Sequence, residues 1–256
     1  MFRPRIIPVL LLKGRGLVKT KQFNKKKAVY IGDPINAVKI FNDMESDELV
    51  FLDITATPEN RTVSVDLIKN IGDEAFMPFA VGGGIRSHND IKNLIAAGAE
   101  KVVINTLFSQ NPKEVLKAAS IFGNQSIIIS IDVKKNTFGK QRIFINCGGK
   151  QLKTNITEYA RMAEEYGAGE ILINSIDNDG MYSGYDIDMV KQIAENVSIP
   201  VIAVGGASNL DDFYKVTKHG NASAAAAGSL FVFHGPRKAV LINYPEKDKL
   251  TKLFTN

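Results

Sequence analysis

Cysteine, histidine and tryptophan are scarce in this 256-residue chain, which has one cysteine, three histidines and no tryptophan. A single cysteine, Cys147, excludes an internal disulfide and any metal site built from several cysteines. The three histidines are scattered and show no zinc-ligand spacing. The sequence therefore predicts neither a metal site nor a cofactor.

Long hydrophobic runs are also missing, because no apolar stretch approaches the roughly 18 residues that span a bilayer. The first residues, MFRPRIIPV, lack the apolar stretch and cleavage site of a signal peptide. We therefore expect a cytoplasmic protein without a membrane span. With 45% hydrophobic and 23% charged residues, the composition is that of an ordinary globular protein.

The formal net charge of +5 is concentrated in one basic run, KTKQFNKKK, from Lys19 to Lys27. A run this short most often forms a solvated loop. Attraction of a phosphorylated ligand is the next interpretation, and nucleic acid or a membrane surface ranks well behind both. We expect a phosphorylated small molecule as ligand and no nucleic-acid partner.

Short apolar runs alternate with segments of helical period, which is typical of repeated βα units around a parallel sheet. Their continuous hydrophobicity indicates strands that are buried on both faces. The predicted strands cover residues 5–12, 48–54, 78–81, 101–105, 126–132, 170–175, 200–204 and 222–228. Periodicity alone would also suit an open, doubly wound sheet.

An internal repeat favours a closed barrel over that open sheet. VGGGIRS at Val81 recurs as VGGASNL at Val204, 123 residues later, and GAEKVVINTLF at Gly98 recurs as GNASAAAAGSLF at Gly220, 122 residues later. Four duplicated βα units make eight, and eight parallel strands can close without exposed edges. We predict a single domain over 1–256, a (β/α)8 TIM barrel with twofold internal repeat and half-barrels of about 1–123 and 124–256.

Glycine-rich turns follow corresponding strands in both halves, where barrels commonly hold phosphates on backbone N–H groups. The alternative is a set of tight turns without a ligand. Because the turns occur twice at matching places, we predict two phosphate sites at opposite sides of one mouth. The first comprises Gly83, Gly84, Asn105 and Thr106, and the second comprises Gly180, Gly205, Gly206, Gly228 and Ser229.

Several motifs together resemble HisF, the cyclase subunit of imidazole glycerol phosphate synthase, from Arg3 to about Phe233. They are RIIPVLLLKGRGLVK, DELVFLDITAT, VGGGI, KVVINT, ISIDVK, GAGEILINSIDNDG, SGYD and VGGAS. The resemblance implies a barrel that takes ammonia from a separate glutaminase, HisH. It also implies that the barrel joins this ammonia to a substrate bearing two phosphates.

The resemblance also implies an ammonia gate at the bottom of the barrel, formed by an Arg, a Glu, a Lys and a Glu. By motif these fall on Arg5, Glu48, Lys101 and Glu170, each at the beginning of a strand. The alternative is a ring of ion pairs that only closes the barrel base. Cys147 lies in INCGGK, in an expected hairpin after the fifth strand, without the His and Glu of a glutaminase. Ammonia must therefore come from a partner or from solution.

One departure from the family concerns the acid and base residues. The resemblance implies aspartates at the ends of strands one and five, and Asp132 is retained, but the other position is Leu11. These two residues are 121 apart, close to the repeat offset, which supports the alignment. A leucine cannot transfer a proton, and losing one member of such a pair typically costs about a hundredfold to ten-thousandfold in rate.

Three hypotheses follow. The chain resembles the HisF-like barrels of surface-polysaccharide gene clusters, which work with a HisH-like glutaminase and a third, sugar-modifying amidotransferase to convert an acetamido into an acetamidino group. The first alternative is an ordinary cyclase of histidine biosynthesis. The second is a non-catalytic barrel that docks and activates a glutaminase, which would not need Asp132.

Three further residues near the strand ends each have two alternative roles. Lys19 matches a family lysine that helps close the loop after strand one on substrate, although a solvated loop lysine is the alternative. Asp53 could orient the site or cap a turn with Thr55. Asp179 could hydrogen-bond the ligand or form a turn with Gly180. The tail from His234 departs from the family, and its prolines, Pro236 and Pro245, are expected to interrupt the last helices.

Overall fold

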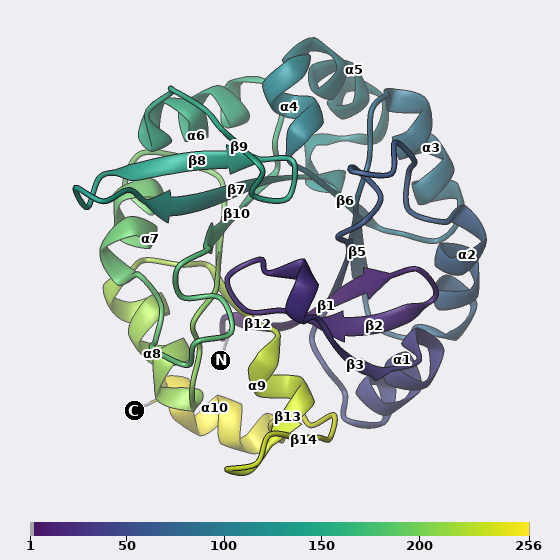
Figure 1. Cartoon of the computed structure of the whole chain (residues 1–256), viewed down its shortest axis with the longest axis vertical. Helices are drawn as coiled ribbons and strands as arrows, with labels where there is room; N and C mark the ends of the chain where they lie inside the picture. The colour runs from purple at the N-terminus through teal and green to yellow at the C-terminus, as the bar shows by residue number, and fades with distance from the viewer. Residues whose placement is uncertain (1–2, 256) are drawn as a thin grey trace.

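Eight parallel strands close into a ring in the computed structural model, which describes residues 3–255 (Figure 1). Each strand pairs with its neighbours, and pairing of β7 with β10 completes the circle. The barrel strands are β1 (Arg5–Lys13), β4 (Leu49–Asp53), β5 (Phe79–Gly82), β6 (Lys101–Ile104), β7 (Ile127–Lys135), β10 (Glu170–Ser175), β11 (Val201–Val204) and β12 (Ala224–Ala227). The predicted (β/α)8 barrel is confirmed, and each strand begins within two residues of its predicted start.

Helices surround this ring and cover the outer face of the strands (Figure 1). They are α1 (Pro34–Asp43), α2 (Val65–Glu74), α3 (His88–Ala96), α4 (Thr106–Gln110), α5 (Pro112–Phe122), α6 (Ile156–Glu165), α7 (Ile187–Ala194), α8 (Leu210–His219), α9 (Ser229–Val232) and α10 (Lys247–Thr255), with 3-10 turns η1 (Lys25–Lys27) and η2 (Asn124–Ser126). Several of these helices have an N-terminal side-chain cap, such as the capping box of Ser87 and Asp90 at α3. Within residues 3–255, no helix has the length and apolarity needed to cross a membrane.

The twofold repeat is visible in two hairpins and in the strand register. The hairpin partner of β1 is β2 (Gly16–Lys19), which also pairs with β3 (Val29–Gly32), and the partner of β7 is β8 (Gln141–Ile145), which continues to β9 (Lys150–Gln151). Leu11 of β1 lies opposite Leu52 of β4, while Asp132 of β7 lies opposite Asn174 of β10. Leu52 and Asn174 are 122 residues apart, so the register makes Leu11 and Asp132 equivalent positions.

The segment between β2 and β3, which we call the lid (residues 20–28), crosses the middle of the ring (Figure 1). Two hydrogen bonds hold it to the loop after β10. Gln22 N donates to Asp179 O at 3.0 Å, and Gln22 Nε2 donates to Asp177 O at 2.8 Å. The basic run of the sequence therefore covers the mouth of the barrel.

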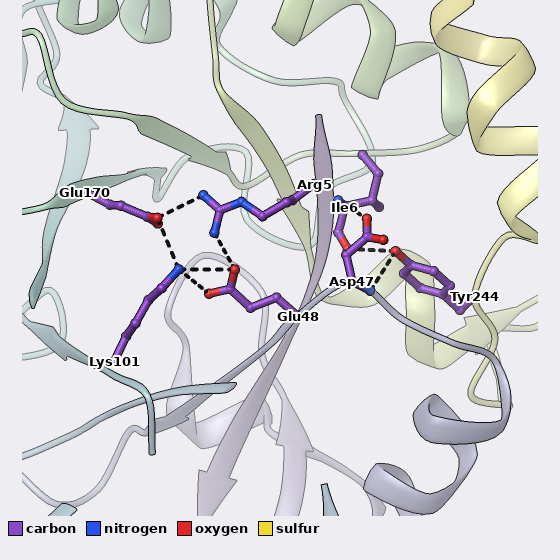
Figure 2. A network of polar contacts seen from close by, with 7 residues as sticks. All are labelled: Arg5, Ile6, Asp47, Glu48, Lys101, Glu170 and Tyr244. Carbon is purple, nitrogen blue, oxygen red and sulfur yellow. Dashed lines mark hydrogen bonds and ion pairs between the residues drawn. The ribbon is translucent and has the colours of Figure 1, made fainter. Parts of the chain in front are cut away.

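The C-terminal segment forms a short hairpin of β13 (Phe233–His234) and β14 (Ala239–Val240), followed by α10. As expected, the segment that contains Pro236 and Pro245 separates the last two helices, and α10 begins two residues after Pro245. Tyr244 ties this segment to the barrel (Figure 2): its hydroxyl donates to Ile6 O at 2.8 Å and accepts from Asp47 N at 3.4 Å. Its ring also packs edge-on against Phe41.

We expect Tyr244→Phe to lower the free energy of unfolding by about 1 to 2 kcal/mol, because a buried hydrogen bond to β1 is lost while the ring packing is kept. Tyr214→Phe on α8 is the control, and we expect it to stay within about 0.5 kcal/mol of wild type. Urea denaturation monitored by circular dichroism measures both. Equal stability of the two variants would contradict this role of Tyr244.

Candidate functional site

Four charged side chains converge at the bottom of the barrel, where the strands begin (Figure 2). We call them the charged ring: Arg5, Glu48, Lys101 and Glu170. Arg5 hydrogen-bonds Glu48, and its Nη2 lies 3.0 Å from Glu170 Oε1. Lys101 Nζ lies 3.1 Å from an oxygen of each glutamate. The structure thus brings the four predicted gate residues together with alternating charges, and breaking one such pair singly is costly.

The inside of the barrel changes from charged to apolar to polar above this ring. Side chains two residues further along the same strands form the next layer, because alternate residues of a strand face the same side. That layer belongs to a separate apolar cluster and consists of Ile7, Val50, Val103 and Leu172. Two residues further on, polar groups appear at Asn105 and Asn174. The interior therefore leads from the charged ring through hydrocarbon to a polar mouth.

A cavity of about 130 Å³, which we call the central cavity, lies at the mouth beneath the lid. Eight of the predicted site residues line it: Lys19, Asp53, Gly83, Gly84, Asn105, Thr106, Asp132 and Asp179. Phe23 and Lys25 of the lid and Cys147 of the β8–β9 turn complete its wall. The first predicted phosphate set and the predicted catalytic aspartate therefore line the same cavity.

Asp132 is the buried carboxylate at the centre of this site, with 8% of its surface exposed. Desolvation by burial raises its pKa to about 7, and the negative charge of Asp179 adds to this, while hydrogen bonds from Ser130 and Asn174 oppose it. Ser130 Oγ donates to Asp132 Oδ1 at 3.3 Å, and Asn105 Nδ2 donates to Oδ2 at 3.4 Å. A carboxyl group with this pKa can take up or release a proton near neutral pH.

Leu11 occupies the equivalent position in the other half-barrel and also lines the central cavity. It packs among apolar side chains that include Val9, Val18 and Leu52. Asp179 is a further carboxylate in the lining, and it lies at ion-pair distance from Lys19 while its charge also acts on Asp132. No carboxylate therefore occupies the position of the family's second aspartate in the cavity wall.

Lys19 is buried, with 5% of its surface exposed, in contrast to the solvated loop lysine of the alternative interpretation. Its Nζ lies 3.8 Å from Asp179 Oδ1. A Cβ atom at Gly228 would lie 2.1 Å from this Nζ, so a side chain at this position would displace the end of the lysine. Lys19, the last residue of β2 and directly before the lid, therefore places a cation at the rim of the central cavity, between the loops that follow β10 and β12.

The paired glycine turns have equivalent surroundings in the two halves. A Cβ at Gly84 would meet Arg61 O at 1.8 Å, and one at Gly206 would meet Gly184 O at 2.0 Å. Both glycines have positive φ, at 67° and 111°, which other residues rarely adopt. Close approach of backbone to backbone thus explains the second glycine of each pair, independently of any ligand.

The second predicted phosphate set is not part of the central cavity. Gly180 and Ser229 line a separate pocket of about 600 Å³, which also includes Lys19. Gly205, Gly206 and Gly228 line neither space. The Cβ of a larger residue at Gly180 would meet Thr20 O of the lid at 2.9 Å. The lid therefore separates the two predicted phosphate ends.

Asp53 serves a structural purpose in its loop. Its Oδ1 accepts hydrogen bonds from Thr55 N at 2.9 Å and from Ala56 N at 3.0 Å, and its Oδ2 pairs with Arg61 at 2.6 Å. Both oxygens are thus occupied by its own turn. Of the two roles that the sequence left open, the geometry supports turn capping.

Asn174, Ser130 and Cys147 were not predicted from the sequence as parts of the site. Asn174 Oδ1 is buried and has no hydrogen-bond partner among residues 3–255, and it lines the central cavity. Period-two alternation back from Asp132 would have found Ser130 as an inward-facing residue. Cys147 reaches the mouth only because the hairpin folds back: its Sγ lies 3.5 Å from Ile54 O, and burial raises the pKa of its thiol despite nearby Lys25.

Comparison with known proteins identifies the family. A model of the family described as histidine biosynthesis protein matches residues 5–236. The chain is 40% identical over 234 residues to the imidazole glycerol phosphate synthase subunit HisF of Alkaliphilus metalliredigens, which covers 91% of this chain and 92% of that relative. The chain belongs to the HisF family.

Two further relatives of this HisF-family barrel carry provisional names. A Pseudomonas aeruginosa protein named as imidazole glycerol phosphate synthase subunit hisF2 is 46% identical over 250 residues, covering 98% of this chain and 99% of the relative. A Vibrio vulnificus protein named as subunit hisF3 is 44% identical over 257 residues, covering 99% and 98%. Membership in this family of synthase subunits supports an enzymatic role.

We expect Asp132→Asn to stabilise the HisF-family barrel at pH 8 by on the order of 3 kcal/mol, and by much less at pH 4.5. The folded-state pKa of about 7 lies above the unfolded value, roughly 3.9. The folded wild type therefore holds its proton between those values and loses stability as the pH rises through this window. Urea denaturation at both pH values measures the difference.

Asp43→Asn is the control for this experiment, because Asp43 is exposed at the end of α1. It should change stability little at either pH. A gap between Asp132→Asn and wild type that is the same at pH 4.5 and pH 8 would show that Asp132 does not titrate as argued.

Proposed function

We propose that this barrel receives ammonia from a HisH-like glutaminase and uses it, at a site with one catalytic carboxylate, on a phosphorylated substrate. The reaction is the conversion of an acetamido to an acetamidino group on a surface-polysaccharide sugar, together with a third, sugar-modifying amidotransferase. The nitrogen of ammonia replaces the carbonyl oxygen of the amide, and that oxygen leaves as water. The observation that carries this proposal is that Leu11 occupies the position in the first half-barrel that Asp132 occupies in the second. Imidazole ring closure in the family requires both acid and base, whereas ammonia delivery requires neither.

The interior supports ammonia passage. The charged ring leads to an apolar layer, which admits a neutral molecule more readily than an ammonium ion because desolvating a charge is costly. Glu170 Oε2 is buried and has no hydrogen-bond partner among residues 3–255, so it offers an acceptor to an incoming N–H group. At the other end, Asp132 can take the proton that ammonia must lose when it forms a C–N bond.

The burial of Asp132 argues against the non-catalytic alternative. A scaffold that only docks a glutaminase has no need of a buried carboxylate, since burying Asp132 raises its pKa and costs stability at neutral pH. The ordinary cyclase remains the second candidate. It is favoured by the retained Asp132 and by both glycine turns, which keep the family pattern.

Cyclase turnover separates the two catalytic candidates. Purified protein supplied with ammonium and the phosphorylated ribonucleotide substrate of the cyclase should turn over at least about a hundredfold more slowly than a HisF enzyme with both aspartates, because one proton-transfer group is absent. Product is followed by its ultraviolet absorbance. Wild-type turnover comparable to that of the two-aspartate enzyme would refute the polysaccharide assignment.

Leu11→Asp extends this test, with Leu11→Asn as the matched variant that adds polarity without a carboxylate. If the missing acid or base is what prevents cyclisation, Leu11→Asp should gain turnover and Leu11→Asn should not. Equal rates for both would place the cause elsewhere in the site.

The glutaminase should dock at the barrel face that carries the charged ring, so that ammonia enters there. Phe76 lies on that face directly before β5 and is 89% exposed. Its backbone N–H is held by Asn42 Oδ1 at 3.0 Å, so the ring is presented from an ordered turn. An ordered, exposed aromatic is typical of an interface anchor.

We expect Phe76→Lys to weaken the complex with the HisH-like glutaminase of the same organism by at least about tenfold. Phe138→Lys is the control, because Phe138 is 86% exposed but lies in the β7–β8 hairpin at the opposite face. Size-exclusion chromatography of the co-expressed pair, followed by titration calorimetry, measures both. Equal weakening by the two variants would contradict docking at the face of the charged ring.

A further inference from the structure

A lysine-rich pocket lies between the lid and the loops that follow β7, β10 and β12, and it has a volume of about 600 Å³. We call it the lysine pocket. Its lining includes five lysines from four segments of the chain: Lys19, Lys21, Lys27, Lys134 and Lys238. None of its described lining residues is an aspartate or a glutamate. Lys19 has Asp179 as a partner, whereas the four other ammonium groups repel one another, and an anion between them would relieve that repulsion.

The carboxylates of the segment between β10 and α7 are engaged elsewhere. Asp177 Oδ2 accepts from the backbone N–H of Lys135 at 2.8 Å, and Asp186 pairs with the Lys135 side chain at 2.7 Å. Asp179 faces Lys19 from the side of the central cavity. Within residues 3–255, Lys21, Lys27, Lys134 and Lys238 therefore have no carboxylate within ion-pair distance.

The walls of the lysine pocket are ordered on the side of β10 and β12. Tyr182 donates from its hydroxyl to Ser229 O at 3.2 Å, which joins the loop after β10 to α9. Lys238 Nζ lies 4.3 Å from the centre of the Tyr182 ring, a cation–π contact that holds this ammonium group at the rim. Met181 and Phe233 add apolar surface beside it.

Size and charge together indicate the class of ligand. The volume lies within the roughly 300 to 1,000 Å³ of ordinary small-molecule sites, so it greatly exceeds the need of one phosphate group. A single phosphate group carries about −1.5 to −2 charges at neutral pH, fewer than the four ammonium groups that have no carboxylate partner. Two adjacent phosphates joined to an organic group would use both the lysines and the apolar wall.

We propose that the lysine pocket binds a diphosphate, the two linked phosphate groups of a nucleotide-activated or similarly activated compound. Lys19 and Thr20 line both this pocket and the central cavity, so a ligand anchored here lies next to Asp132's cavity. That the organic end of this ligand is the substrate rests on the function proposed above. Diphosphate binding itself does not.

Titration calorimetry with inorganic pyrophosphate and with orthophosphate tests the proposal on the whole chain. Wild type should bind pyrophosphate at least about tenfold more tightly than orthophosphate, since more charge-assisted hydrogen bonds form. The double variant Lys134→Gln/Lys238→Gln should lose roughly tenfold to a hundredfold in pyrophosphate affinity. Both lysines are exposed, so thermal melting should be unchanged and the variant should fold.

The matched control is Lys92→Gln/Lys117→Gln, which removes the same charge from the exposed surfaces of α3 and α5. It should leave pyrophosphate affinity within about twofold of wild type, since distant surface charges are screened by salt. Equal wild-type affinity for both anions, or equal losses in the two double variants, would overturn the proposal. The assay contains no ammonia and no organic substrate, so its result is independent of the cyclase and docking experiments.

Discussion

Closure of the strand ring, through the ladders that join β1 to β12 and β7 to β10, is the constraint on which the other features depend. In a closed barrel every second residue of a strand faces inward, so residues two apart become successive layers. Along β1 this stacks Arg5, Ile7, Val9 and Leu11 from the base to the mouth. A slip of one residue would exchange the inner and outer sets. The charged ring, the apolar layer and the polar mouth are thus consequences of one register.

The lid depends on the same closure. Lys19, the last residue of β2 and directly before the lid, lies against Gly228 after β12 and Asp179 after β10, and the loop after β12 lies beside β1 because β12 pairs with β1. Glycine at 228 removes the side chain that would collide with the lysine, and Asp179 lies at ion-pair distance from its charge. The lid therefore lies over the mouth because backbone groups of the loop after β10 bind it. Its basic residues line both the central cavity beneath it and the lysine pocket beside it.

The sequence predicted those features that repeat or that follow strand ends. The eight strands follow from periodicity and the internal repeat. The equivalence of Leu11 with Asp132 follows from the family resemblance with the support of the repeat offset, and the charged ring follows from the resemblance. Features that depend on side chains from distant loops could not be predicted. Lys134 and Lys238 are 104 residues apart and meet one pocket only in the folded chain. The sequence also left the role of Asp53 open, because it does not show that Arg61 binds the second carboxylate oxygen.

The distribution of charge around the lid constrains how a ligand can lie. Asp132 already has a pKa of about 7, and a polyanion placed in the central cavity would raise it further by repulsion, which would keep the carboxyl protonated and unable to accept a proton. The other four lysines of the lysine pocket lie on the other side of Lys19 and Thr20, where they would hold that negative charge apart from Asp132. With one carboxylate remaining of the family pair, keeping it titratable near neutral pH matters more than in a site with two. If the phosphates are anchored outside the central cavity and only the neutral, reacting end of the ligand enters it, the ligand is bound by the lysines and Asp132 can still titrate near neutral pH.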